Sequence, residues 1–394
     1  MQRIAIAWQV GSGFGWGEYG YQIARRLLAR GKAMPLLLEP TGALEIDTLE
    51  KAQIDPILRE QPGMAAELRR SSEQPRLRVP VLHALGNEAA PVFCDLGANV
   101  QGSPDHALLF LESSRIDRDA IDRLARHRIL VAGSTWNGHL LVGAGVGNVV
   151  VSLQGVDPTI FHPGPRGGRF GDRFVIFSGG KLEYRKGQDI ALAAFSAFRQ
   201  RHPEALLLAL WGNPWPDSPQ SRLFTHSPHV DGPPPVDAKG RADPRPWFRR
   251  HNIPIEAAFM FSRMPQLQLA RMLRECDVAL FPNRCEGGTN LMAMEAMASG
   301  VPTILSANTG HLDIMAENAC YPLNNQTTIA SPTPRIGMAG WGESSIEETV
   351  EMLELVWRDR ETARQVGLNG AALMADFSWD KRIDGLIEKL ELPG

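Results

Sequence analysis

Two carboxylates flank a run of small and polar residues in the segment Arg284–Gly300, RCEGGTNLMAMEAMASG. Glu286 is followed by two glycines, and Glu295 lies in the strong helix-forming run Leu291–Ala298. The preceding apolar run 277–282 (DVALFP) predicts a buried parallel strand. A glycine turn between a strand and a helix favours a bound anion, because free backbone N–H groups and the helix dipole face it. Carboxylates there can also accept hydrogen bonds from sugar hydroxyls. An ordinary strand–helix connection with two solvent-facing acids is the alternative.

A second candidate site follows the predicted strand Arg173–Ser178 (RFVIFS). The next residues are GGKLEYRKG, in which a glycine pair precedes Lys181 and Lys186. Lysines around a tight turn suit a diphosphate, because each ammonium is a mobile point charge with several donors. A surface turn with solvated lysines is the alternative interpretation.

A third motif, near the start of the chain, resembles a dinucleotide-binding unit. A strand at Arg3–Val10 is followed by the loop Gly11–Gly17 (GSGFGWG), a helix, and a second strand that ends in Glu39. In a dinucleotide-binding protein this acid would hold a ribose. The glycine spacing is not GxGxxG, so an NAD-dependent oxidoreductase is an alternative function and not the favoured one.

The segment EGGTNLMAMEAMASGVP, followed by SANTGHLDI, resembles the donor-site signature of retaining glycosyltransferases of family 4, which have the GT-B fold. The resemblance covers most of the chain and is strongest at residues 277–306. Three features depart from the family pattern. Glu286 and Glu295 are one residue further apart than usual, Lys181 stands where the family usually has arginine, and Glu112 stands near the position of a usual cleft histidine. His83, at the end of the predicted strand 77–85, is another candidate for that role. The alternative is that neither residue takes it and that His83 is a structural histidine.

The resemblance implies transfer of a sugar from a UDP- or GDP-sugar to a glycan or lipid-linked glycan, with retention and without a metal or other cofactor. Lysines would hold the donor diphosphate, the first glutamate the hydroxyls of the reacting sugar, and the second glutamate the ribose. The candidate catalytic residues are Glu286, Lys181, Lys186, Glu112 and His83. The candidate donor-binding residues are Gly15, Gly17, Gly180, Arg263, Met264, Gly287, Gly288, Thr289, Asn290, Leu291 and Glu295.

The expected fold is α/β, with two Rossmann-like, doubly wound domains that face each other across a cleft. A length of 394 residues already indicates more than one core. We expect an acceptor-side domain at 1–163, a glycine- and proline-rich hinge at 164–172, and a nucleotide-sugar-binding domain at 173–376. Within the predicted nucleotide-sugar-binding domain, we expect residues 213–247 to form an inserted surface loop. The resemblance implies that 377–394 form a helix that crosses back to the N-terminal domain.

Composition and motifs bear on which partners the protein binds and on where in the cell it is expected. A net charge of −3 argues against a nucleic-acid partner. The four cysteines form no CxxC pair, which predicts reduced thiols in the cytoplasm. No apolar run reaches membrane-spanning length, while basic helix ends leave weak contact with the inner membrane face open. There is no DxD motif in a suitable position and no His/Cys cluster for a metal. The family implies polysaccharide synthesis, and the sequence does not predict the oligomeric state.

Two further alternatives share the GT-B fold. A catalytically silent nucleotide-sugar-binding protein would be compatible with the departures at Lys181, Glu112 and the glutamate spacing. An epimerase on the same frame lacks acid and base carboxylates that can be assigned in this sequence.

Overall fold

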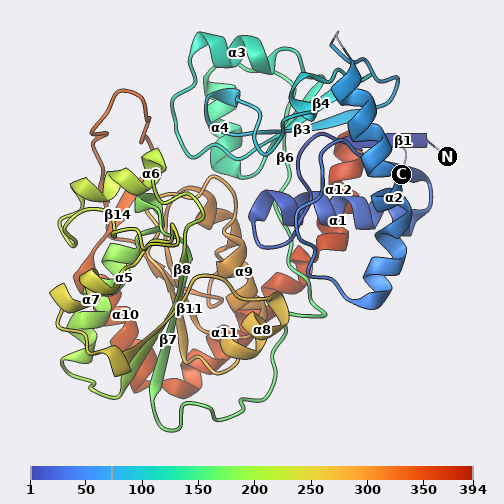
Figure 1. Cartoon of the computed structure of the whole chain (residues 1–394). Helices are drawn as coiled ribbons and strands as arrows, with labels where there is room; N and C mark the ends of the chain where they lie inside the picture. The colour runs from blue at the N-terminus through green and yellow to red at the C-terminus, as the bar shows by residue number, and fades with distance from the viewer. Residues whose placement is uncertain (1, 72–73, 393–394) are drawn as a thin grey trace. The chain divides into compact units, whose positions relative to one another are not determined.

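The computed structural model describes residues 2–71 and 74–392 (Figure 1). The chain forms two compact units. Unit 1 contains the described residues of Met1–Gly155, Gly287–Thr289 and Phe377–Gly394, and unit 2 contains Val156–Glu286 and Asn290–Asp376. The predicted domain borders stay predictions.

Unit 1 is built on a parallel sheet with the strand order β2-β1-β3-β4-β5-β6. Apolar residues fill most strand positions because helices cover a parallel sheet on both faces. Its strands are β1 Gln2–Ile6, β2 Ala33–Leu37, β3 Val81–Leu85, β4 Asp105–Leu109, β5 Ile129–Ala132 and β6 Val149–Val151. Its helices are α1 Gly15–Arg30, α2 Thr48–Arg70, α3 Arg118–Leu124, α4 Thr135–Gly143 and α12 Trp379–Lys389, with short 3-10 turns at Asn87–Ala89 and Gly97–Asn99. A further 3-10 turn, Ala375–Phe377, begins in unit 2 and ends at the first residue of the last segment of unit 1.

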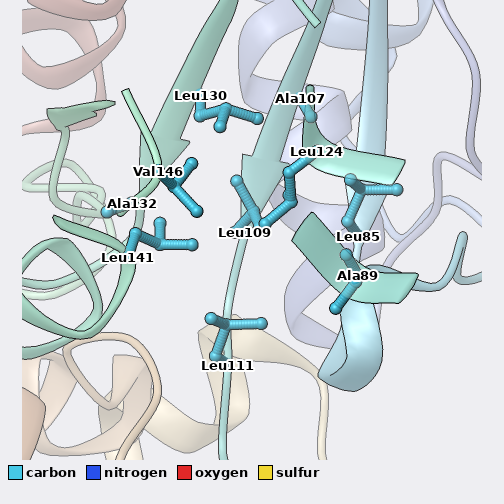
Figure 2. Close-up of a cluster of buried hydrophobic side chains, with 11 residues drawn as sticks. Leu85, Ala89, Ala107, Leu109, Leu111, Leu124, Leu130, Ala132, Leu141 and Val146 are labelled. Atoms are coloured by element: carbon cyan, nitrogen blue, oxygen red, sulfur yellow. The ribbon is translucent and has the colours of Figure 1, made fainter. Parts of the chain in front are cut away.

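One hydrophobic cluster of unit 1 lies where β3, β4 and β5 meet the helices α3 and α4. Figure 2 shows Leu109 and Leu130 of the strands together with Leu124 of α3 and Leu141 of α4, all of them buried. Burial of such leucine side chains contributes roughly 1.5–3 kcal/mol each. The carboxyl ends of these strands are thereby held at one edge of the sheet.

The C-terminal helix α12 packs against α1 within unit 1. Arg25 forms an ion pair with Asp380 at 2.5 Å. Asp384 forms ion pairs with Arg26 and with Arg30, the second at 2.8 Å. The ring centroids of Tyr19 and Trp379 are 5.6 Å apart. These contacts attach the end of the chain to its first helix.

Unit 2 is built on a second parallel sheet, with the order β12-β11-β10-β7-β8-β9. Its strands are β7 Phe174–Lys181, β8 Ala205–Gly212, β9 Ala258–Phe261, β10 Val278–Phe281, β11 Thr303–Ser306 and β12 Tyr321–Leu323, beside an antiparallel hairpin of β13 Gln326–Thr328 and β14 Gly342–Ser344. Its helices are α5 Gln188–Arg199, α6 Pro219–Arg222, α7 Arg245–Arg250, α8 Gln266–Leu273, α9 Leu291–Ala298, α10 Ile346–Arg358 and α11 Arg360–Met374. Short 3-10 turns lie at Tyr184–Lys186, Leu223–His226, Ile255–Ala257 and Thr309–Ile314. The predicted α/β class with two doubly wound sheets is confirmed.

The segment 213–247, predicted to be a surface loop, packs against other parts of unit 2, to which it belongs. It contains α6 and the start of α7, and it buries Phe224 and Trp247, whose ring centroids are 4.8 Å apart. Phe224 also lies 6.0 Å from the ring of Tyr184. The segment is predicted to be a surface loop because its composition is polar. Its two buried aromatic residues instead attach it to the turn after β7.

Within residues 2–71 and 74–392, none of the helices is long and apolar enough to span a bilayer. The four cysteines are free. No group of three or more His, Cys, Asp or Glu side chains in the same residues is placed to hold a metal ion.

Candidate functional site

The strand order of unit 2 reverses between β7 and β10. From β7 the chain proceeds outward to β8 and β9, and from β10 it proceeds the other way to β11 and β12. The loops that follow β7 and β10 therefore diverge, and in doubly wound sheets ligands bind in the crevice at such a point. Lys181 is the last residue of β7, Lys186 lies in the turn after it, and Glu286 follows β10.

Glu286 is held by three donors at this point of the sheet. Lys186 Nζ donates to its Oε1 at 2.5 Å, Arg185 Nη1 donates to its Oε2 at 3.2 Å, and the side-chain amide of Asn283 also donates to Oε1. Its side chain is only 5% exposed. Burial on its own would raise the pKa of Glu286, but Lys186 and Arg185 hold that pKa below its ordinary value. The carboxylate is thus ionised and fixed, with lone-pair capacity left on Oε2.

Lys186 is nearly buried beside this carboxylate. Burial lowers its pKa, and the charge of Glu286 opposes that shift. Its ammonium has three N–H donors and gives one to Glu286, so it retains donors for a second anion.

Lys181, the last residue of β7, is more exposed than Lys186. Its ammonium pairs with Glu183 at 3.2 Å and lies 5.6 Å from the centre of the Trp215 ring. Glu183 is buried and also pairs with Arg185 at 2.7 Å. Burial raises the pKa of Glu183, but Arg185, Lys181 and Lys186 bring that pKa down to about 2.

The two loops at the reversal point are joined by their backbones and by a buried arginine. The amides of Arg284 and Cys285 donate to the carbonyl of Arg185 at 2.7 and 3.1 Å. The guanidinium of Arg284 is fully buried between Asp189, at 2.7 Å, and Glu343, at 2.5 Å. It also lies 3.8 Å from the centre of the Tyr184 ring. Arg284 therefore connects the two turns that carry Lys186 and Glu286.

Sequence reasoning missed Glu183, Arg185 and Arg284. Their charges are visible in the sequence, but charged residues are usually solvated, and nothing local signals that these three are buried. The strand order brings the oppositely charged partners together from segments about 100 residues apart along the chain.

The start of α9 is set by a neutral histidine. Asn290 adopts the left-handed conformation, with φ 64°, and its amide donates to His311 Nε2 at 2.9 Å. The other ring nitrogen, Nδ1, lies 3.0 Å from the hydroxyl of Ser306, which itself donates to the carbonyl of Asn283 at 2.6 Å. Burial lowers the pKa of His311 to about 4, so the ring is neutral and can accept from Asn290.

We expect His311 to make stability depend on pH between about 6.5 and 4. In the unfolded chain the ring binds a proton near its ordinary pKa of 6.5, whereas the folded ring does so only near 4. Its contribution is therefore complete above pH 6.5 and is lost as the pH falls, by about 3 kcal/mol in all. Urea denaturation at several pH values should show a shallower pH dependence for His311→Gln than for the natural protein. Parallel curves for the two proteins would contradict this role.

Glycines between Glu286 and α9 are required by close packing within unit 1. A Cβ on Gly287 would lie 2.6 Å from the carbonyl oxygen of Leu111, and one on Gly288 would lie 2.7 Å from Gln154 Oε1. Thr289 is buried, with its hydroxyl 3.4 Å from the same Gln154 oxygen. A side chain at Gly287 would therefore meet backbone, whereas one at Gly288 would have to displace the side chains of Gln154 and Phe110.

Three other predicted donor residues lie near the reversal point of unit 2. Gly180, with φ 134°, approaches the stem of Lys186, and a Cβ there would lie 3.5 Å from Lys186 Cδ. Leu291 and Glu295 are half-buried and are four residues apart on α9, so they share a helix face.

Arg263 and Met264 are not next to these residues in the sheet. They follow β9, an edge strand that β8 separates from β7, and Arg263 is exposed. Both share the carboxyl edge of the sheet with Lys186, but neither lies on the turns that carry Lys186 or Glu286.

Two predicted glycines lie in the first turn of α1 in unit 1. The helix begins at Gly15, so the last three residues of the predicted loop Gly11–Gly17 belong to it. A Cβ on Gly17 would lie 2.4 Å from the carbonyl oxygen of Gly11, so this loop folds directly onto its helix. Glu112 lies past the carboxyl end of β4, where its backbone amide donates to Asn87 at 2.8 Å.

The structure does not support the prediction for His83. Its Nε2 lies 2.9 Å from Asp105, the first residue of β4, and its ring centroid lies 5.4 Å from that of His127, which precedes β5. These partners are at the amino ends of the strands, opposite the edge where ligands bind in such sheets. A linear pattern could not reveal this, because the direction of the side chain depends on its pairing.

Glu39 is likewise a structural residue. Its buried Oε1 accepts hydrogen bonds from the backbone amides of Asp95, Leu96 and Gly97 at 2.8, 2.6 and 2.6 Å. The side chain of Glu39 is also buried, so its second carboxylate oxygen is not open to a ribose. The NAD-dependent alternative therefore loses the acid on which it depended.

Comparison with protein families identifies the class of domain. Residues 165–333 match the family model "Glycosyl transferases group 1". This range contains the turns that carry Lys181, Lys186 and Glu286. The chain therefore carries a glycosyltransferase group 1 domain, and its two doubly wound sheets form a GT-B fold.

The similar proteins are remote relatives. The chain is 24% identical over 244 residues to glycogen synthase of Mycobacterium tuberculosis, covering 61% of this chain and 47% of that protein. It is 28% identical over 209 residues to D-inositol 3-phosphate glycosyltransferase of Stackebrandtia nassauensis, covering 49% and 42% of the two chains. The chain thus spans less than half the length of these curated relatives.

Solved structures resemble this chain over nearly its whole length. Sucrose-phosphate synthase from Thermosynechococcus elongatus has a TM-score of 0.65 at 15% identity and covers 99% of this chain and 98% of its own. Anabaena HepE in complex with UDP-glucose has a TM-score of 0.63 at 13% identity and covers 99% and 100%. At these identities the likeness concerns the fold alone.

Proposed function

We propose that this protein is a retaining glycosyltransferase of family 4 that moves a sugar from a UDP- or GDP-sugar to a glycan or lipid-linked glycan. One observation carries the proposal: Lys186 and Glu286 are in contact, at 2.5 Å, where the unit 2 sheet reverses its strand order. This arrangement offers a cation for phosphate beside a fixed carboxylate for sugar hydroxyls. The group 1 match and the UDP-glucose complex of HepE support the same donor class.

In this mechanism the bond between the anomeric carbon and the diphosphate oxygen breaks, and negative charge grows on the departing diphosphate. Lys181, Lys186 and Arg185 exceed the acids Glu183 and Glu286 by one charge and would stabilise it. The acceptor oxygen forms the new bond on the same face, and its proton passes to the departing phosphate. Glu286 would orient the reacting sugar, and no protein nucleophile is assigned.

Because these cations neutralise the leaving group, the proposal needs no metal. Cytoplasmic location, weak membrane contact and a role in polysaccharide synthesis stay predictions.

The test is to incubate the protein with UDP- and GDP-sugars and a panel of glycan acceptors, and to determine the anomeric configuration of the product by NMR. We expect the configuration of the donor to be retained. Inversion would refute the proposed mechanism. Donor-dependent thermal stabilisation without turnover would instead favour the silent nucleotide-sugar-binding protein.

We further expect Glu295→Ala to raise the KM for the donor more than the KM for the acceptor, because Glu295 is assigned to the ribose. Loss of a charged hydrogen bond corresponds to roughly a tenfold or larger effect. Steady-state kinetics with each substrate varied in turn would measure both constants. A larger change in the acceptor KM would contradict the assignment.

A further inference from the structure

A cavity lined by arginines lies in unit 2 at the amino ends of β10 and β11. It has a volume of about 490 Å³ and is formed by the chain before β7, the ends of α8, α9 and α10, and the start of α11. Lys186 and Glu286 lie at the carboxyl edge of the same sheet, so this arginine cavity is separate from the proposed donor site. Four arginines line it, Arg166, Arg274, Arg360 and Arg364, and its one acid is Asp277.

Three of these arginines are held in place by protein atoms. Asp277 accepts from Arg166 at 2.8 Å and from Arg360 at 3.0 Å. Arg274 donates to the carbonyls of Ile160 and His162 at 3.0 and 3.1 Å. Asp277 also accepts from the amide of Val175 at 2.7 Å. The single negative charge of this carboxylate is therefore shared among three donors.

Arg364, unlike the other three arginines, is not held by protein atoms among the described residues. It makes no hydrogen bond or ion pair with any residue that the structure describes, although it lines the cavity one turn after Arg360 on α11. Within the same residues, Nη2 of Arg360 is also without a hydrogen bond. The cavity thus presents an excess of three positive charges and unused guanidinium donors.

We infer that the arginine cavity binds a small phosphorylated molecule. Guanidinium groups match the oxygens of a phosphate in a forked geometry, and four of them line this cavity, three of them on exposed residues. The other walls include the apolar side chains Leu273, Val301 and Leu368, which suit an organic part larger than phosphate alone. The volume also falls within the range of small-molecule sites. The ligand class is therefore a phosphate ester, such as a sugar phosphate or a nucleoside monophosphate.

Isothermal titration with glucose 6-phosphate, AMP, inorganic phosphate and uncharged glucose tests this inference. We expect at least one ester to bind, glucose not to bind, and Arg364→Glu to weaken ester binding about tenfold or more. Arg364→Gln should act in the same direction with a smaller effect. Both variants should fold, because Arg364 has no partner among the described residues to lose. Arg126→Glu, which changes an exposed arginine of unit 1, is the matched control and should bind as the natural protein does.

Lys186→Ala distinguishes this cavity from the proposed donor site. Ester binding that survives Lys186→Ala and depends on Arg364 supports the inference, whatever becomes of the proposed transfer activity. Binding that is lost in Lys186→Ala and unchanged in Arg364→Glu would assign the ester to the donor site and overturn it. No ester binding up to about 10 mM would also overturn it. Arg364-dependent sedimentation with phosphatidylglycerol vesicles, without ester binding, would overturn it in favour of a lipid surface.

Discussion

We expect Lys186→Ala to lower the rate of sugar transfer by roughly 10²–10³-fold, the typical loss when one preorganised donor to a developing negative charge is removed. The nearly buried ammonium of Lys186 is fixed by Glu286 and retains donors for the diphosphate. The protein should still fold, because Arg185 and Asn283 continue to donate to Glu286 after the substitution. Single-turnover rates at saturating donor would measure the loss.

A matched control is Lys32→Ala, which removes an exposed lysine of unit 1. This variant should retain the natural rate. Circular dichroism and the melting temperature would establish that both variants are folded. Near-full activity of Lys186→Ala would remove Lys186 from the proposed phosphate site, even if the protein proved to be a glycosyltransferase.

We expect Arg284→Met to destabilise unit 2 by about 3–5 kcal/mol, because breaking a buried ion pair leaves an uncompensated charge. The guanidinium of Arg284 is fully buried between Asp189 and Glu343. Burial opposes its charge, but these two acids raise the pKa of Arg284 above its ordinary value. Methionine would fill a similar volume and leave Asp189 without its cation. Urea denaturation followed by circular dichroism would measure the loss.

Arg358→Met is the control for this prediction. The side chain of Arg358 is 68% exposed and lies 3.9 Å from Glu354, so its removal should cost less than about 1 kcal/mol. Equal and small effects of both substitutions would show that the Arg284 network does not hold the two turns together. A large effect for Arg284→Met alone is the expected outcome.

Much of the fold follows from local patterns in the chain. Apolar runs such as DVALFP and RFVIFS predict parallel strands, and the glycine-rich segments after them predict turns, because these features depend on neighbouring residues only. The carboxyl ends of parallel strands share one edge, so Lys186 and Glu286 could be expected near the same edge before their contact was known. The match of residues 165–333 to the group 1 family agrees with the motif recognised there.

Only the three-dimensional structure shows which groups the charged residues pair with. Glu39 and His83 follow or lie in strands just as the other candidates do, yet one binds three loop amides and the other pairs with Asp105 at the opposite edge. The sequence does not indicate that Arg284 is buried, yet the structure buries it fully between Asp189 and Glu343, which come from distant segments. Hydrophobic periodicity specifies which residues form a strand, but strand order and long-range packing specify which charges are desolvated and paired. Local sequence therefore located the glycine turns, whereas tertiary packing selected the side chains that converge on them.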